Sequence, residues 1–186
     1  MKGLLRVLAI DDGYFKPKKK GKALLVGIIS RLDGRIEGVL STSVSVDGLD
    51  STSKIIKMLE KSKFKQQANF IILDGLNFAG FNLVDLQKLS EKLGIPAIAV
   101  QRKKPRMQKI EKALSGFKDK KKRMKLIKKA GKVHKGKKVF FQCTGADAKT
   151  VKTVLTKTTK YSNLPEPLRL AHLIASGLTL GQSTRP

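Results

Sequence analysis

Acidic residues are scarce in this sequence: 14 Asp and Glu stand against 40 Lys and Arg, which gives a formal net charge of +26. Tryptophan is absent and tyrosine occurs twice. The single cysteine, Cys143, excludes a disulfide within the chain and suits a reducing cytoplasm. No signal peptide and no long apolar run is present, so we expect a cytoplasmic protein that neither is secreted nor spans a membrane.

The excess of positive charge predicts a polyanionic partner, and nucleic acid, either DNA or RNA, is the usual one. A membrane surface is disfavoured, because no segment pairs a basic face with a broad aromatic and aliphatic face. With so few aromatic residues, binding should depend on phosphates more than on base stacking. The length of 186 residues suits one domain, residues 1–186, and we expect a monomer.

The positive charge is concentrated in two clusters. Between Arg102 and Lys138 there are 18 Lys and Arg but only two acidic residues, and KPKKKGK spans Lys16 to Lys22. A lysine run is often only a solvated surface, but two dense clusters in so basic a chain favour a binding face. The candidate nucleic-acid contacts are Lys18, Lys19, Lys20, Arg102, Lys103, Lys104, Arg106, Lys120, Lys121, Lys122 and Arg123.

Apolar runs and helical spacings alternate along the chain and predict an α/β fold. The first three strands should form an antiparallel unit, with Asp33-Gly34 as a hairpin turn. The later strands should be parallel, because helices separate them. Asn82 is the expected N-cap of one helix, with Gly94 as its stop, and Pro165 should open the last helix. Strands are expected at 4–11, 22–31, 35–44, 69–73, 95–100 and 139–143, and helices at 51–61, 82–92, 106–114, 118–130, 146–156 and from 165 onward.

Carboxylates follow two of the apolar strands. Asp11 and Asp12 end LAIDD, and Asp74 ends IILD. Sites in α/β sheets form at the carboxyl ends of strands, so neighbouring strands would bring these carboxylates together. Carboxylates that lie this close repel one another unless a cation lies between them. Mg²⁺ prefers oxygen ligands, which carboxylates and a substrate phosphate supply. The alternative is that each Asp only caps its own turn. Their recurrence in an acid-poor chain favours a metal.

Two further residues have open assignments. Asp50, in SVDGLDSTSK, is either the N-cap of the helix that follows or a third metal ligand. His172 lies on one predicted helical face with Arg169 and Ser176, and a lone helical histidine is more often structural than functional. His134, within the lysine run, has no context that assigns it.

Four segments resemble endonuclease V, a family with the RNase H-like fold, and the correspondence covers most of the chain. The doubled Asp motif and the long central Asp motif are most similar to an archaeal branch of endonuclease-V-like proteins. The segments that carry the resemblance are LAIDDGYF, IILDGLNFAG, GIPAIAVQRK and LPEPLRLAHLIA.

This resemblance implies an RNase H-like mixed sheet flanked by helices and a divalent-metal-dependent hydrolysis of phosphodiester bonds near deaminated bases, as in DNA repair. It implies Mg²⁺ or Mn²⁺ held by Asp11 or Asp12, Asp50, Asp74 and His172. The same resemblance makes Asp11, Asp50, Asp74 and Arg102 catalytic. Arg102 stands where the family has a lysine and would pair with phosphate.

Several family features are missing. Gly80 lies near the place of a family histidine, no aromatic wedge precedes Asp50, and CTGAD replaces the family's Ser-Pro-Gly-His turn. These losses fall on base recognition more than on the carboxylates. A second hypothesis is therefore a non-catalytic module that binds nucleic acid, such as structured or ribosomal RNA, with a vestigial metal site.

Overall fold

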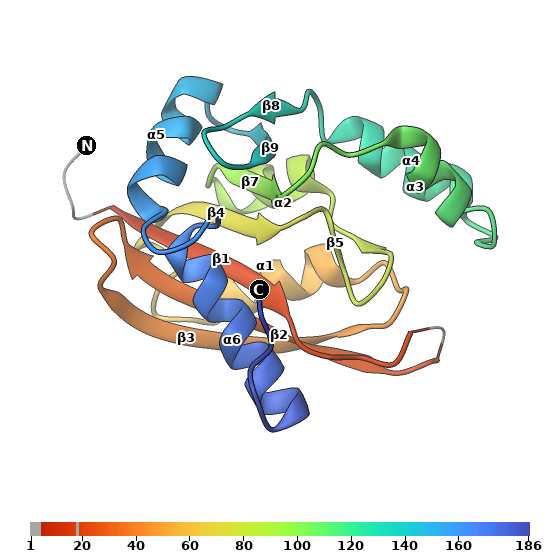
Figure 1. Ribbon diagram of the computed structural model, residues 1–186, viewed down its shortest axis with the longest axis horizontal. Helices are drawn as coiled ribbons and strands as arrows, with labels where there is room; N and C mark the ends of the chain where they lie inside the picture. The colour runs from red at the N-terminus through yellow and green to blue at the C-terminus, as the bar shows by residue number, and fades with distance from the viewer. Residues whose placement is uncertain (1–4, 18) are drawn as a thin grey trace.

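The computed structural model describes residues 5–17 and 19–186, so Lys18 lies outside the described residues. Its main element is a seven-stranded sheet of strand order β3-β2-β1-β4-β7-β9-β8 (Figure 1). The strands of this sheet are β1 (Arg6–Asp12), β2 (Lys22–Arg31), β3 (Ile36–Ser45), β4 (Ala68–Asp74), β7 (Ala97–Gln101), β8 (His134–Lys135) and β9 (Phe140–Thr144). A separate two-stranded sheet joins β5 (Asn77–Phe78) and β6 (Asn82–Leu83).

Six helices complete the described fold: α1 (Ser51–Glu60), α2 (Leu86–Leu93), α3 (Met107–Ala113), α4 (Lys120–Lys129), α5 (Ala148–Thr158) and α6 (Glu166–Leu180). Among the described residues, no helix is both long and apolar enough to span a bilayer.

The predicted mixed sheet is confirmed. Strand β2 pairs with β1 and β3 in antiparallel directions, whereas β1–β4 and β4–β7 are parallel. The expectation that all later strands are parallel is wrong for β9, which runs antiparallel to β7. The chain leaves the carboxyl end of β7 and passes through α3, α4 and the short strand β8. It re-enters the sheet at the same end, where Phe140 pairs with Gln101, so β9 must run back.

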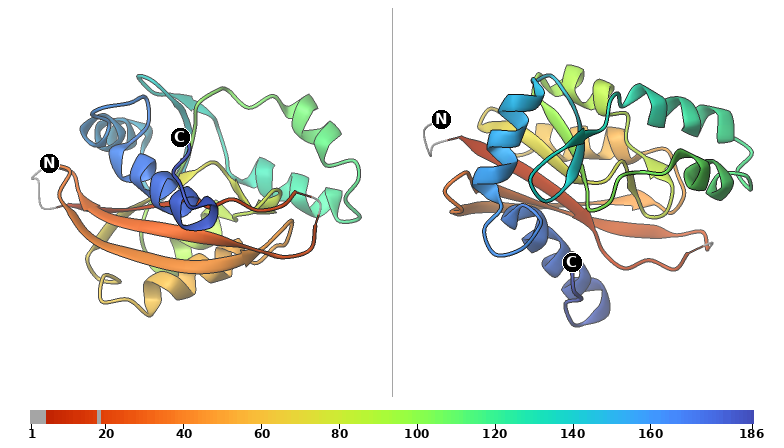
Figure 2. Two further views of the ribbon diagram at one scale, coloured as in Figure 1. Left: turned by 60° about the horizontal axis from the view of Figure 1, so that its bottom comes forward. Right: turned by 45° about the horizontal axis from the view of Figure 1, so that its top comes forward.

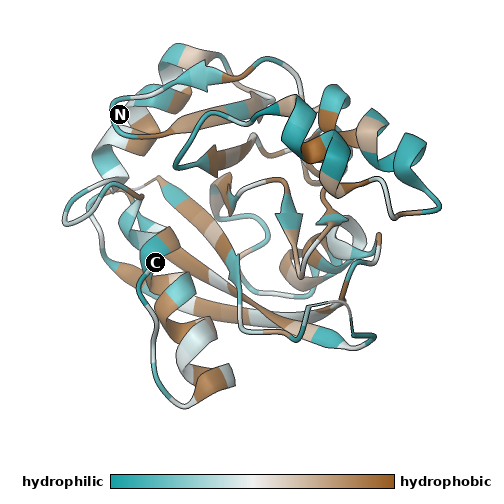
Figure 3. Cartoon of the chain, turned by 45° about the vertical axis from the view of Figure 1, so that its right-hand side comes forward, coloured by the Kyte–Doolittle hydropathy of each residue, from teal (hydrophilic) through white to brown (hydrophobic). Residues whose placement is uncertain are grey.

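The core forms two layers because side chains alternate along the buried strands. Leu8 and Ile10 of β1 belong to the cluster that includes the inner faces of α1 and α2. Val7 and Ala9 belong to the cluster that includes α5 and the start of α6. The left view of Figure 2 shows α1 and α6 on opposite faces of the sheet, and the central strands are mostly hydrophobic in Figure 3.

The start of α2 differs from the sequence prediction. Its N-cap is Asp85, whose side chain accepts a hydrogen bond from the Lys88 N–H at 3.0 Å. Asn82, the expected cap, is fully buried in β6 and donates to the Ser45 carbonyl instead. Gly94 ends the helix in the left-handed conformation, as predicted. Pro165 is the N-cap of α6 rather than its first helical residue.

Helices α3 and α4 extend beyond one end of the sheet, as all views in Figures 1 and 2 show. We call residues 107–129 the basic arm. Leu114 and Ile127 join it to the apolar core, and most of its lysines are exposed. The arm thus places positive charge next to the carboxyl ends of the parallel strands without contributing to the sheet itself.

Candidate active site

The carboxyl ends of β1 and β4 meet at one edge of the sheet. Ile10 of β1 lies beside Leu73 of β4, so Asp11 and Asp74 follow at neighbouring positions of adjacent parallel strands. This arrangement is the one that the two strand-end motifs predict. Gly75, with a φ of 86°, turns the chain immediately after Asp74 and donates to the Val100 carbonyl at 2.8 Å.

These strand ends form one wall of a hollow of about 550 Å³, which we call the carboxylate hollow. Helix α6 and the residues that follow it supply the opposite wall. Five of the residues singled out from the sequence line it together: Asp11, Asp12, Asp74, Arg102 and His172. Asp50 does not line it.

Asp11 and His172 are joined by a hydrogen bond. The imidazole Nδ1–H lies 2.8 Å from Asp11 Oδ2, and Asp11 is 4% exposed. This bond to Asp11 raises the pKa of His172, although partial burial of the ring acts in the opposite direction. The other ring nitrogen, Nε2, lies 3.0 Å from the Thr184 hydroxyl. The helix therefore presents an oriented histidine to the strand-end carboxylate.

Asp12 and Asp74 have unusually high pKa values. Burial raises the pKa of Asp12 to about 7, and the nearby charges of Asp11 and Asp74 add to that rise. Burial and the charge of Asp11 raise the pKa of Asp74 to about 6, against the lowering effect of Arg102. Buried carboxylates that repel one another in this way favour the binding of a proton or a metal cation.

Arg102 contributes positive charge to the same hollow. Its Nη1 lies 3.3 Å from Asp74 Oδ2, and its side chain is 45% exposed. An ion pair as exposed as this one is weak, so the guanidinium remains available to an anionic ligand. Arginine can contact two phosphate oxygens at once, which a lysine ammonium at this position cannot do in the same planar geometry.

Gly13 allows α6 to approach the end of β1. A Cβ atom at this position would lie 2.7 Å from Thr179 Cγ2 and 2.8 Å from the Ala175 carbonyl oxygen. The Tyr14 N–H donates to the Thr179 hydroxyl at 2.9 Å, which holds the two segments together. The position of His172 over Asp11 therefore depends on a residue without a side chain at position 13.

Asp50 lies in a separate hydrogen-bond network. Its carboxylate accepts bonds from Asn82 Nδ2 at 2.5 Å and from the Ser45 N–H at 3.1 Å. Burial acts to raise the pKa of Asp50, but these bonds outweigh it and lower the pKa below its ordinary value. Asp50 occupies the N-cap position of α1 without a side-chain cap bond. Its assignment as a metal ligand stays a prediction from the resemblance.

Two hydrogen-bond contacts in the carboxylate hollow could not be predicted from any sequence motif. The Thr184 hydroxyl contacts His172 from a segment without recognisable motif. The Ala79 N–H donates to Asp12 Oδ2 at 2.6 Å, so the loop after β5 orients this carboxylate. Only the folded chain brings these partners together, since 12 residues separate His172 from Thr184 and 67 separate Asp12 from Ala79.

The predicted nucleic-acid contacts occupy three kinds of position. Lys120 is partly exposed and lies 3.6 Å from Glu111, whereas Arg123 is only 4% exposed. Arg123 donates to the carbonyl oxygens of Asp47, Gly48 and Phe81 and to the Asp119 carboxylate, so most of its N–H donors are used within the fold. We therefore correct its assignment to a structural one. The exposed members of the set are Lys19, Lys20, Arg102, Lys103, Lys104, Arg106, Lys121 and Lys122.

The donor set of the hollow suits a hard divalent metal, because it consists of carboxylate oxygens with a histidine beside them. Within residues 5–17 and 19–186, no three His, Cys, Asp or Glu side chains already converge in a geometry that would hold an ion. Asp11 is bonded to His172 and Asp74 is paired with Arg102. An ion that binds here must therefore replace at least one of these contacts.

Comparison with known proteins decides the family. A family model described as endonuclease dU matches residues 4–179. The chain belongs to the endonuclease dU family. A UPF0215 protein of Methanopyrus kandleri is 42% identical over 97% of this chain and 94% of its own length. Another, from Methanothermobacter thermautotrophicus, is 43% identical over 98% of this chain and 92% of its own length.

Solved structures show that the fold of this endonuclease dU family member is similar to that of endonuclease V. A crystal structure of an Archaeoglobus fulgidus protein matches with a TM-score of 0.87 and 34% identity over 94% of this chain and 98% of that one. Endonuclease V of Bacillus subtilis matches with a TM-score of 0.65 at 13% identity, over 95% of this chain and 81% of that one. These matches confirm the RNase H-like fold and the predicted resemblance to an archaeal endonuclease-V-like branch.

Endonuclease V of Ciona intestinalis, solved with a 24mer DNA that contains an inosine followed by a ribo-adenosine, has a TM-score of 0.61 and 16% identity. The match covers 95% of this chain and 86% of that one. At this identity the likeness concerns the fold.

Proposed function

We propose that this endonuclease dU family member is a divalent-metal-dependent endonuclease that hydrolyses phosphodiester bonds of nucleic acid near a deaminated base. The observation that carries the proposal is the carboxylate hollow, in which Asp11, Asp12, Asp74 and His172 lie together in a protein of net charge +26. The family's description favours deoxyuridine as the deaminated residue.

The carboxylates of Asp11, Asp12 and Asp74 would hold the metal, with His172 oriented against Asp11. Mg²⁺ or Mn²⁺ would supply a water of lowered pKa and positive charge against the phosphate. Arg102, at the rim, binds a non-bridging phosphate oxygen and stabilises the negative charge that develops there. The exposed lysines of the basic arm attract the polyanion and hold its backbone.

A second cavity supports recognition of a base. It has a volume of about 400 Å³ and begins at Leu76 and Asn77, directly after the Asp74-Gly75 turn. Phe81, Ile110 and other apolar side chains form most of its walls, and the amides of Asn77, Gln101 and Gln142 supply polar groups. Apolar walls with a few amides suit a nucleobase that leaves its stack, and amides can bond to its Watson–Crick edge.

The test compares wild type with Asp74→Asn on labelled oligonucleotides that contain uracil, hypoxanthine or only normal bases, as DNA and as RNA. We expect wild type to cleave near uracil when Mg²⁺ or Mn²⁺ is added and to lose cleavage in EDTA. Asp74→Asn keeps the shape of the side chain but removes a charged ligand, so cleavage should fall by at least about 10-fold to 100-fold. Its affinity for the oligonucleotide should be equal or higher, because a negative charge is removed.

Asp33→Asn is the matched control, because Asp33 lies in the β2–β3 turn and its replacement makes the same charge change away from the hollow. This variant should cleave like wild type. If Asp74→Asn cleaves as fast as wild type, the carboxylate hollow is not the catalytic site.

Binding without cleavage is the second candidate function. It is favoured by the internal pairing of Asp11 with His172 and of Asp74 with Arg102, which satisfies these groups without a metal. Metal titration separates the two candidates. A catalytic protein should gain thermal stability with Mn²⁺ in wild type but not in Asp74→Asn. No stabilisation, together with no cleavage on the whole panel, would favour the binding module.

A further inference from the structure

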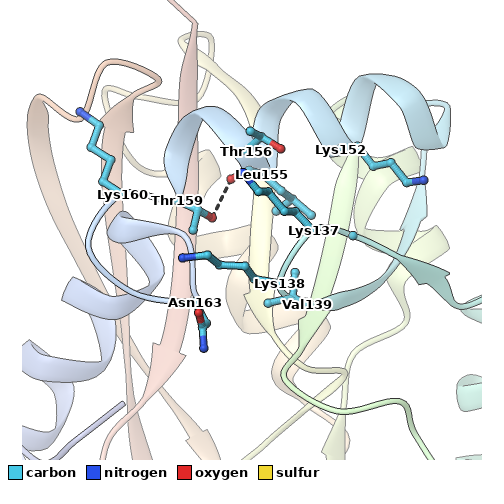
Figure 4. A pocket seen from close by; sticks show the side chains of 10 residues that line it. Lys137, Lys138, Val139, Lys152, Leu155, Thr156, Thr159, Lys160 and Asn163 are labelled. Carbon is cyan, nitrogen blue, oxygen red and sulfur yellow. Dashed lines mark hydrogen bonds between the residues drawn. The ribbon is translucent and has the colours of Figure 1, made fainter.

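A small positive pocket lies between α5 and the turn that joins β8 to β9, apart from the carboxylate hollow (Figure 4). Its volume is about 230 Å³. Lys137 and Lys138 come from the turn, Lys152 from α5, and Lys160 from the segment after α5. We call it the α5 pocket. No carboxylate lines it.

The charges of the α5 pocket are not neutralised by acidic residues in the part of the chain that the structure describes. Lys138 Nζ donates to the Ser162 carbonyl at 3.3 Å, and Lys160 Nζ donates to the Asp33 carbonyl. These carbonyl contacts orient the two ammonium groups but leave their charge uncompensated. Four cations around one concavity focus a positive potential there, which a single surface lysine does not.

The remaining lining suits a phosphate that carries a sugar. Thr156 contributes a hydroxyl and Asn163 an amide, and both can donate hydrogen bonds to phosphate oxygens, whereas the Thr159 hydroxyl donates to the Leu155 carbonyl at 2.7 Å. Figure 4 shows the Lys138 side chain extending between Thr159 and Asn163. Val139 and Leu155, 6% and 4% exposed, form an apolar floor.

Neighbouring residues connect the surroundings of the α5 pocket with those of the carboxylate hollow. A third hollow is lined by Arg102, Lys103, Lys104, Arg106, Lys109 and Phe140. It shares Arg102 with the carboxylate hollow, and Phe140 directly follows Val139 of the α5 pocket. The pairing of Gln101 with Phe140 brings these segments side by side at one end of the sheet. Residues of the third hollow thus adjoin both other hollows, and the α5 pocket and the third hollow are lined by cations without acids.

We propose that the α5 pocket binds a backbone phosphate of the same nucleic-acid strand whose phosphodiester bond lies in the carboxylate hollow, several nucleotides from that bond. This inference rests on the proposed function for the position of the strand. Three adjoining hollows favour a continuous strand over a free nucleotide, because a mononucleotide would need only one of them.

The test measures binding with fluorescent single-stranded DNA that contains one uracil, in EDTA so that no cleavage occurs. One oligonucleotide is long enough to reach both sites, and a second is a short one centred on the uracil. The variant is Lys137→Gln/Lys138→Gln/Lys152→Gln. The matched control is Lys57→Gln/Lys61→Gln/Lys65→Gln, which removes the same charge from exposed positions in and after α1, on the other face of the sheet.

The pocket variant should bind the long strand roughly tenfold more weakly, with a salt slope lower by about one unit. It should bind the short strand like wild type, and the control variant should bind both strands like wild type. Equal losses in the pocket variant and the control would show a general charge effect and overturn the proposal. Unchanged affinity of the pocket variant for the long strand would overturn it as well.

A free nucleotide is the other source of phosphate. Calorimetry with dUMP and inorganic phosphate tests it: micromolar binding to wild type that the pocket variant loses, without any dependence on strand length, overturns the assignment to a strand. Because the assay measures binding, it separates the two proposals. A wild type that cleaves nothing but shows the length-dependent loss would refute the proposed endonuclease and retain this pocket.

Discussion

Replacement of Arg123 tests whether this residue serves the fold rather than nucleic acid. The guanidinium donates to Asp119 Oδ1 at 2.7 Å, to the Asp47 carbonyl at 2.7 Å, to the Gly48 carbonyl at 3.1 Å and to the Phe81 carbonyl. It also stacks 4.5 Å from the centroid of Phe117. One side chain thus joins the basic arm to two loops of the body.

Arg123→Met keeps the length of the side chain and removes every donor. Each carbonyl left without a partner in a buried position costs about 1–3 kcal/mol. Asp119 is partly exposed and can be solvated, so the loss of its ion pair with Arg123 adds little to the destabilisation. Because part of the arm can open to water, we expect the free energy of unfolding to fall by about 3–5 kcal/mol in total. For a chain of this size that corresponds to a decrease in Tm of about 6 to 20 °C.

Thermal and urea unfolding monitored by circular dichroism measure this change. Lys122→Met, next in sequence and exposed, is the control and should stay within about 0.5 kcal/mol of wild type. Arg123→Lys should restore little, because one ammonium cannot reach three carbonyls at once. A loss below about 1 kcal/mol in Arg123→Met, combined with a weaker affinity for nucleic acid, would refute the structural assignment.

Three further predictions concern the site and its supports. His172→Ala should weaken Mn²⁺ affinity about 10-fold to 100-fold in calorimetry with the fold intact, and a variant with unchanged affinity would contradict a role in the metal site. Gly13→Ala should destabilise by about 1–3 kcal/mol in thermal unfolding, because the new Cβ would press α6 away from β1. For Asp85, burial acts to raise the pKa, but its bonds with Lys129 and Lys88 hold the pKa below its ordinary value. Its stabilising effect should therefore be present above the ordinary pKa and be lost as the pH falls through the lowered one. Asp85→Asn should flatten that part of the stability–pH curve.

The sequence predicted the strands well because burial on both faces leaves continuous apolar runs in β1, β4 and β7. It also predicted that Asp11 and Asp74 are neighbours, since parallel strands bring their carboxyl ends to one edge. The predictions that failed depended on long-range partners. Asn82 has the composition of a helix cap, but it is buried because it bonds to Ser45 and Asp50 across the loop between β3 and α1.

Arg123 shows the same limit for charged residues. It follows three lysines in a run that is otherwise exposed, and no local pattern distinguishes it from Lys122. The direction of β9 was also not predictable from its own residues. It depends on whether the preceding helices cross over the sheet or project from it, and that choice is made by contacts such as those of Leu114 and Ile127.

The basic arm and the carboxylate hollow are connected by a series of three hydrogen bonds. Arg123 binds the Asp47 carbonyl, the Asp47 N–H donates to the Ala79 carbonyl at 2.8 Å, and the Ala79 N–H donates to Asp12 at 2.6 Å. Among the described residues other than glycine, Asp47 and Ala79 are the two with positive φ, at 53° and 46°. Such conformations cost about 1–3 kcal/mol each and persist where surrounding contacts enforce them.

Both strained residues lie on this path from the arm to Asp12, and Arg123 contacts the first of them from the arm. The Phe81 N–H also donates to Asp47 Oδ1 at 2.8 Å, so Arg123 adds its three carbonyl contacts to loops that already hold one another. The position of the arm and the orientation of Asp12 are therefore parts of one rigid arrangement. This arrangement explains why a buried arginine stands within a run of exposed lysines.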